Sequence, residues 1–224
     1  MERHERQFDR ELSVLKNKLI HMAAVAESMI DKAIGELVNR DESLAEQIPQ
    51  MEEELNRLQI DIDEEAMTLL ATQQPVAIDL RFIVTASKIN SELERIGDLV
   101  INITENVHVL VAQPPIKPLI DIPRMAELAR KMTRQSLDAF MKEDVLTAQA
   151  VISSDDQVDA LKDQVVRELL TYMMADASTI ERALALILIA RHLERIADHA
   201  TNIAQDVIYL VQARDVRHPR LKRE

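Results

Sequence analysis

The sequence predicts an all-α protein made of two tandem three-helix bundles, with six helices related by an internal duplication. The first observation is compositional: the 224 residues include only two glycines, and 47 % of them are hydrophobic but only 2 % aromatic. Residue types compatible with helices dominate such a chain. The second observation is that apolar residues recur at steps of three and four, which places them on one side of a helix. The third is a nine-residue motif that occurs twice, 100 residues apart.

The composition also limits the classes of function. The formal charge is −12, and lysine and arginine gather only between Arg214 and Arg223, so we expect no nucleic-acid binding. The chain has no cysteine, which excludes disulfides and thiolate metal sites and suits a reducing compartment. No signal peptide is visible, and the longest apolar run, Ala183–Ala190, is too short to cross a bilayer. We therefore expect a cytoplasmic protein that does not insert into the membrane.

The first unit, residues 1–111, is expected to contain three helices. Apolar spacing predicts a first helix over residues 8–39, after which Asp41 can cap the next segment. Pro49 fits the start of the second helix, which should end before Pro75. The third helix is predicted over residues 76–111 and would be roughly 50 Å long.

Two local features of this unit have more than one interpretation. The acidic run Glu52–Glu54 would suit the helix dipole if it lies in the first turn, and we favour this capping role over metal ligation. Gly35 lies inside the pattern of the first helix. We interpret it as a tolerated glycine, with a close helix contact as the alternative.

A linker and a second unit follow. Residues 112–123 hold four of the seven prolines, so this segment should be extended and semi-rigid. The second unit, residues 124–224, repeats the plan of the first. Its helices are predicted from Pro123 to Lys142, from Ser153-Ser154-Asp155 to about Ala175, and from a Ser178 cap to about Ala213. Whether a pseudo-twofold axis or a translation relates the two units is left open.

The duplicated motif lies in the last helix of each unit. Its copies are Glu94–Asn102 and Glu194–Asn202, and five of their positions are identical. On a helical wheel, Glu94, Asp98 and Asn102 lie on the side opposite the apolar stripe. Each unit therefore offers a long helix with two acids and an amide in a row.

Acids four residues apart repel each other on a helix, so this row has two interpretations. It is either a solvated face or an oxygen-ligand metal site whose carboxylates reach a common cation. The candidate ligands are Glu94, Asp98, Asn102, Glu194, Asp198 and Asn202. We assign the neighbouring Arg95 and Arg195 to salt bridges.

The histidines and the missing motifs argue against catalysis. A di-iron bundle needs two Glu-x-x-His pairs, and Glu105 with His108 is the only such pair on a long helix. His199 lies beside Asp198 and could be a ligand, but we interpret it as solvated. The chain has no glycine-rich phosphate loop, no Gly-x-Ser-x-Gly motif and no cysteine nucleophile. We predict that the protein is not an enzyme.

On these residues the chain resembles the PhoU family of phosphate-transport accessory proteins. The resemblance is carried by Glu94–Asp98 with Asn102, by Glu194–His199 with Asn202, and by Gln74–Arg81, and it spans nearly the whole sequence. It implies the two three-helix bundles. It also implies one metal site at Glu94 and Asp98 and another at Glu194 and Asp198, with the two asparagines as further ligands or supports. The implied metals are divalent or trivalent ions such as iron, zinc or nickel.

The resemblance further implies a regulatory role. The family acts as a negative regulator of phosphate uptake and of the phosphate-starvation response. The implied partners are the ATPase subunit of a phosphate ABC transporter and a membrane sensor histidine kinase, and we expect a homodimer. Because no anion-binding loop is visible, we expect the protein to report on the transporter rather than to bind phosphate. The alternatives are a carboxylate-bridged metal enzyme, either an oxidase or a hydrolase, and a helical scaffold without metal.

Overall fold

The computed structural model describes residues 2–217, with side chains described for residues 7–41 and 43–217. These residues form six α-helices and no strand, which confirms the predicted fold class. The α-helices are α1 (Glu2–Asn39), α2 (Ile48–Gln73), α3 (Ile78–Val111), α4 (Asp121–Lys142), α5 (Val145–Ala175) and α6 (Ile180–Gln212). Two short 3₁₀ helices, η1 (Glu42–Gln47) and η2 (Ala177–Thr179), precede α2 and α6. Most of the basic segment from Arg214 to Arg223 lies outside the described residues.

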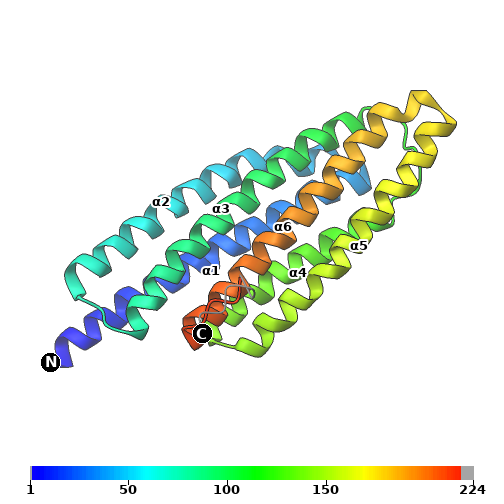
Figure 1. Cartoon of the computed structure of the whole chain (residues 1–224). Helices are drawn as coiled ribbons and strands as arrows, with labels where there is room; N and C mark the ends of the chain where they lie inside the picture. Colours follow the sequence, from blue (N-terminus) through cyan, green and yellow to red (C-terminus); the bar gives the residue numbers. More distant parts are fainter. Residues whose placement is uncertain (1, 218–224) are drawn as a thin grey trace.

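The two bundles lie side by side along one long axis (Figure 1). Helices α1, α2 and α3 form the first bundle, and α4, α5 and α6 form the second. Helix α3 packs against α6 and α1 against α4, whereas α2 and α5 lie at the outer edges. Among the described residues, the outer helices α2 and α5 each pack only against elements of their own bundle.

A pseudo-twofold axis relates the bundles, because α3 and α6 run antiparallel. The Arg81 side chain at the start of α3 donates to the carbonyl oxygen of Leu210 near the end of α6, at 3.2 Å. At the other end of α3, the Gln113 amide donates to Glu181 in the first turn of α6, also at 3.2 Å. A translation would have made the two helices parallel. The question that the sequence left open is thus answered in favour of the twofold.

The hydrophobic core is continuous between the two bundles. Phe140 of α4 is among the largest fully buried side chains. Its ring stacks on that of Phe82 in α3, with the ring centroids 4.6 Å apart. This contact joins a helix of the first bundle to a helix of the second, so neither bundle completes its core alone.

Several predicted helix boundaries are confirmed. Arg40 has a positive φ of 55°, which ends the first helix, and the Asp41 carboxylate accepts the backbone N–H of Ser43 at 3.1 Å. Pro49 lies in the first turn of α2, as predicted. Since α2 begins at Ile48, however, Glu52–Glu54 lies beyond its first turn, and the capping interpretation of this acidic run is wrong.

Two predicted helix starts in the second unit are wrong. Helix α5 begins at Val145, where Asp144 accepts the backbone N–H of Leu146 at 2.9 Å, and not at residues 153–155. Ser153 and Ser154 lie inside this helix and donate to carbonyl oxygens four residues earlier. Before α6 the cap is Asp176, which accepts the backbone N–H of Ser178. Cap-forming residue types are thus tolerated within a helix that tertiary packing stabilises.

Both glycines lie at close contacts. A Cβ atom at Gly97 of α3 would lie 3.1 Å from Cδ1 of Leu55 in α2, and one at Gly35 would lie 3.2 Å from Cδ1 of Leu44. The interpretation of Gly35 as merely tolerated is therefore wrong. The equivalent of Gly97 in the second bundle is Ala197, so only the first bundle requires this close approach.

We expect Gly97→Ala to lower the free energy of unfolding by about 1 kcal/mol. Overpacking against the buried Leu55 costs about 1–3 kcal/mol, and the higher helix propensity of alanine returns about 1 kcal/mol of it. Urea denaturation followed by circular dichroism measures the difference. In a Leu55→Ala background the same change should become stabilising, and a destabilisation there would contradict the packing explanation.

Candidate functional site

Four acidic side chains lie on the α5–α6 side of the second bundle. Glu194 and Asp198 lie one turn apart on α6, and the neighbouring helix contributes Asp155 and Asp159, also one turn apart. The charges of Asp198 and Asp159 both act on Asp155, and that of Asp159 acts on Asp198. We call this set of four interacting carboxylates from two helices the second acidic face.

The carboxylates of this face disfavour each other's charged forms. Burial, together with the negative charges of Asp198 and Asp159, raises the pKa of Asp155 to about 6. Burial and the neighbouring Asp159 raise the pKa of Asp198 in the same direction. Burial also raises the pKa of Glu194, although Lys162 opposes that shift. The face therefore holds more negative charge than its surroundings neutralise.

One ammonium group already occupies part of the second acidic face. The Nζ atom of Lys162 lies 3.4 Å from Oε1 of Glu194, 3.7 Å from Oδ1 of Asp159 and 3.5 Å from Oδ1 of Asp163. It is an internal counter-ion for Glu194 on α6 and for Asp159 and Asp163 on α5. Among the described residues, Asp155 and Asp198 have no ion pair at this distance.

The pKa of Asp155 predicts how the stability of the metal-free protein depends on pH. Because this pKa is about 6 in the folded state and 3.8 ordinarily, the folded state binds a proton more readily than the unfolded state. Stability from this group should therefore fall as the pH rises from about 4 to 6, and stay low above that. Urea midpoints of the wild type and Asp155→Asn over this range measure the effect. The variant should show the flatter profile and the higher stability at pH 7, and identical profiles would contradict the assignment.

The α2–α3 side of the first bundle carries the first acidic face. The buried positions Ile48, Leu55, Ile62 and Ala66 of α2 recur with the same spacing in α5 as Val151, Val158, Val165 and Leu169. This alignment makes Glu52 equivalent to Asp155, Asn56 to Asp159 and Gln59 to Lys162. Burial and the charge of Asp98 raise the pKa of Glu94 here as well. The first face thus has one carboxylate fewer than the second and no counterpart of its lysine.

The structure separates the two asparagines from the acids. The Asn102 amide donates to the backbone carbonyl of Asp98 in its own helix, at 2.8 Å. The Asn202 amide turns to the other bundle and donates to Oε2 of Glu92 on α3, at 3.1 Å. As the side chains stand, neither amide oxygen is shared with the acids of its motif.

The interpretation of His199 as a solvated side chain is wrong. It is only 8 % exposed, and its Nδ1 lies 2.6 Å from the same Glu92 carboxylate. The Glu92–His199 pair therefore belongs to the contact between α3 and α6, which the twofold arrangement creates. Arg95 and Arg195 are exposed and make no ion pair within 4 Å among the residues with described side chains, so the salt bridges assigned to them are not found.

The two side chains of the Glu-x-x-His pair in α3 have different neighbours. Its histidine, His108, lies with Nε2 3.4 Å from Oε1 of Glu36, a fully buried carboxylate on α1. The charge of the exposed Glu105 acts instead on His192 of α6, in the second bundle.

The side-chain oxygens of the acidic faces determine whether a metal ion fits there. Within the part of the chain that the structure describes, no three His, Cys, Asp or Glu side chains already converge on one point. The donor chemistry of the second face nevertheless fits a hard cation, because it consists of carboxylate oxygens whose mutual repulsion raises their pKa values. Binding there would require the side chains to rotate and Lys162 to move aside.

Asp155 and Asp159 are the candidate site residues that sequence reasoning missed. They form the same acid-x-x-x-acid spacing as the duplicated motif, one helix earlier in the chain. That signal was readable, but the interpretation of Ser153-Ser154-Asp155 as a helix start assigned Asp155 to a cap.

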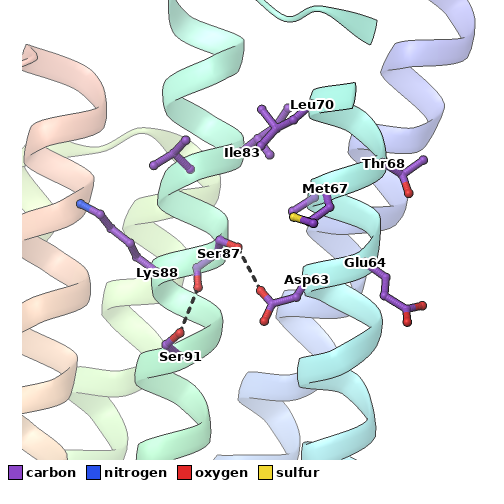
Figure 2. A pocket seen from close by; sticks show the side chains of 11 residues that line it. Asp63, Glu64, Met67, Thr68, Leu70, Ile83, Ser87, Lys88 and Ser91 are labelled. Carbon is purple, nitrogen blue, oxygen red and sulfur yellow. Dashed lines mark hydrogen bonds between the residues drawn. The ribbon is translucent and has the colours of Figure 1, made fainter. Parts of the chain in front are cut away.

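A second surface feature lies farther along the first bundle. A hollow of about 960 Å³ opens between the C-terminal half of α2 and the N-terminal half of α3. Figure 2 shows Met67, Leu70 and Ile83, which line this hollow. It also shows the hydrogen bond that Ser87 donates to Asp63, which is 2.9 Å long. We call this hollow, with its eleven lining residues, the α2–α3 groove pocket.

Together these observations define a class: an all-α protein of two related three-helix bundles, with an acidic face on each. No helix among the described residues is long and apolar enough to span a membrane. The PhoU domain model matches residues 19–107 and 122–207, one match in each bundle. The chain belongs to the PhoU family.

Individual relatives match this chain over most of their own lengths. The chain is 38 % identical over 218 residues to the phosphate-specific transport system accessory protein PhoU homolog of Pseudomonas putida. The alignment covers 97 % of this chain and 85 % of that protein. The crystal structure of PhoU from Pseudomonas aeruginosa superposes with a TM-score of 0.88 at 36 % identity, and covers 92 % of this chain and 100 % of that one. The phosphate transport system regulatory protein PhoU from Streptococcus pneumoniae gives a TM-score of 0.84 at 27 % identity, covering 93 % and 99 %.

Proposed function

We propose that this protein is a non-enzymatic regulatory adaptor that restrains phosphate uptake and phosphate-starvation signalling when phosphate is abundant. The observation that carries the proposal is the match of both bundles to PhoU proteins, whose names describe accessory or regulatory roles in phosphate transport. The adaptor would couple the ATPase subunit of a phosphate ABC transporter to a sensor histidine kinase. We further propose that it works in the cytoplasm as a homodimer, which sedimentation velocity can test.

Deletion of the gene is expected to raise expression of the phosphate transporter and of phosphatases in phosphate-replete medium, because the restraint on the kinase is lost. Quantitative measurement of transcripts and of phosphatase activity checks this. A plasmid copy of the gene should restore low expression. Unchanged expression in the deletion strain would remove the regulatory role.

The acidic faces are proposed to bind divalent or trivalent metal ions such as iron, zinc or nickel. Glu194 and Asp198 would act with Asp155 and Asp159 on the second face, and Glu94 and Asp98 on the first. When bound, the ion would supply the positive charge that the repelling carboxylates lack. Asn102 and Asn202 would support their faces, since both amides already have hydrogen-bond partners in the absence of metal.

A carboxylate-bridged metal enzyme, either an oxidase or a hydrolase, is the alternative. The observation in its favour is the pKa of about 6 at Asp155, which suits an acid–base group near neutral pH. Assays of oxygen consumption and of phosphatase activity on metal-loaded protein separate the two functions. Turnover that is lost in Asp98→Ala and Asp198→Ala would favour the enzyme.

A further inference from the structure

We propose that the α2–α3 groove pocket is a docking site for a basic amphipathic helix of a partner protein. The inference extends the proposed adaptor function by naming the surface and the chemistry of its partner. Its test uses no gene-expression readout, so the two proposals can fail separately.

Two of the exposed side chains that line the pocket are large and apolar. Met67 is 71 % exposed and Val84 is 41 % exposed, and both line the hollow. Large apolar side chains gathered around one hollow on a soluble protein mark an interaction surface. Methionine is well suited to this role because its flexible thioether adapts to different partners.

The duplication provides an internal comparison for this surface. The helix alignment makes Met67 equivalent to Leu170 and Val84 equivalent to Leu184, and these are 48 % and 50 % exposed. Both halves of the chain therefore keep a large apolar residue at these exposed positions. The charge beside them differs, since Arg167 stands where the first bundle has Glu64.

The charges of the pocket select the occupant. Its lining includes Asp63 and Glu64 on one side and Lys88 on the other. The Lys88 ammonium is already engaged, with Nζ 3.0 Å from Oδ1 of Asp206 on α6. The charge left for a partner is negative, so a lysine or arginine of the partner would complement it.

The shape of the pocket selects a helix. The lining residues extend over Asp63–Leu70 on α2 and Ile83–Ser91 on α3, about two turns of each helix. An apolar hollow between two helices is the usual receptor for the apolar face of a third, with contacts at every third or fourth residue. The occupant would therefore present two or three apolar side chains from consecutive turns and a basic residue beside them.

Two synthetic 18-residue peptides test the proposal, one an amphipathic Leu/Lys helix and the other a Leu/Glu helix of the same pattern. Fluorescence anisotropy at 0.15 M salt should show that the wild type binds the Leu/Lys peptide at least tenfold more tightly than the Leu/Glu peptide. Replacing the apolar contacts with Met67→Gln and Val84→Gln should weaken Leu/Lys binding at least tenfold. The matched control, Leu146→Gln with Met174→Gln, changes two exposed apolar residues of α5 and should leave binding unchanged. Glu64→Lys should weaken Leu/Lys binding and strengthen Leu/Glu binding.

Hydrogen exchange should locate the Leu/Lys peptide by protection of residues 63–70 and 83–91. Equal binding by the Met67→Gln, Val84→Gln variant, or protection confined to other segments, would overturn the proposal. Self-association of the wild type that disappears in this variant would show a second copy of the chain in the pocket and would overturn the assigned partner.

Discussion

Replacing the four carboxylates of the second acidic face by amides is expected to abolish metal binding at that face. The variant combines Asp155→Asn, Asp159→Asn, Glu194→Gln and Asp198→Asn, which keep shape but remove the charge that attracts a cation. An ion at 100 times its dissociation constant stabilises the folded state by about 2.7 kcal/mol, and this gain should disappear. Elemental analysis of the purified protein and melting curves with added iron, zinc or nickel measure the two effects.

The same variant should be more stable than the wild type when both are free of metal, because it lacks the repulsion that raises the pKa of Asp155. Glu52→Gln, Glu94→Gln and Asp98→Asn together are the matched change on the first face. Lys162→Met acts in the opposite direction: it removes the competing ammonium and should lower the metal concentration needed for half-saturation. Full metal content after the acids of both faces are replaced would contradict the proposed sites.

Phe140→Ala is expected to lower the free energy of unfolding by about 3–5 kcal/mol, the usual cost of truncating a buried aromatic ring. Because its ring stacks on Phe82 of the other bundle, the loss should be felt by both bundles together. Urea denaturation followed by circular dichroism should show one transition in both proteins, shifted to lower urea in the variant.

Leu146→Ala, at an exposed position of α5, is the control and should change stability by no more than about 0.5 kcal/mol. Two separate transitions in the wild type, or a shift confined to one of them in Phe140→Ala, would show that the bundles fold independently. The continuous core would then contribute little to the coupling between them.

The sequence predicted the features that depend on one helix at a time. Apolar spacing was enough for the six helices, and the internal repeat was enough to single out Glu94, Asp98 and their equivalents. Both signals are periodic, so they can be recognised without knowing which helices lie next to each other. The residues near breaks, such as Arg40 and Asp41, were also readable because caps act locally.

The features that sequence reasoning missed depend on how the helices pack against one another. Asp155 was assigned to a helix start because Ser153 and Ser154 resemble a cap, and only packing on α6 carries the helix past them. The place of His199 could not be predicted either. Its partner Glu92 comes from the other bundle, and their contact exists only because α3 and α6 run antiparallel.

The antiparallel pairing of α3 and α6 affects the orientation in which a partner can bind the molecule. A body with a true twofold looks the same after being turned end over end, so a partner could attach in either of two orientations. This chain breaks that degeneracy at many positions, among them Lys162 against Gln59, His199 against Leu99, Gly97 against Ala197, and Glu64 against Arg167. These differences make the two ends of the molecule chemically distinct, so the adaptor proposed above could hold two different proteins in one fixed orientation.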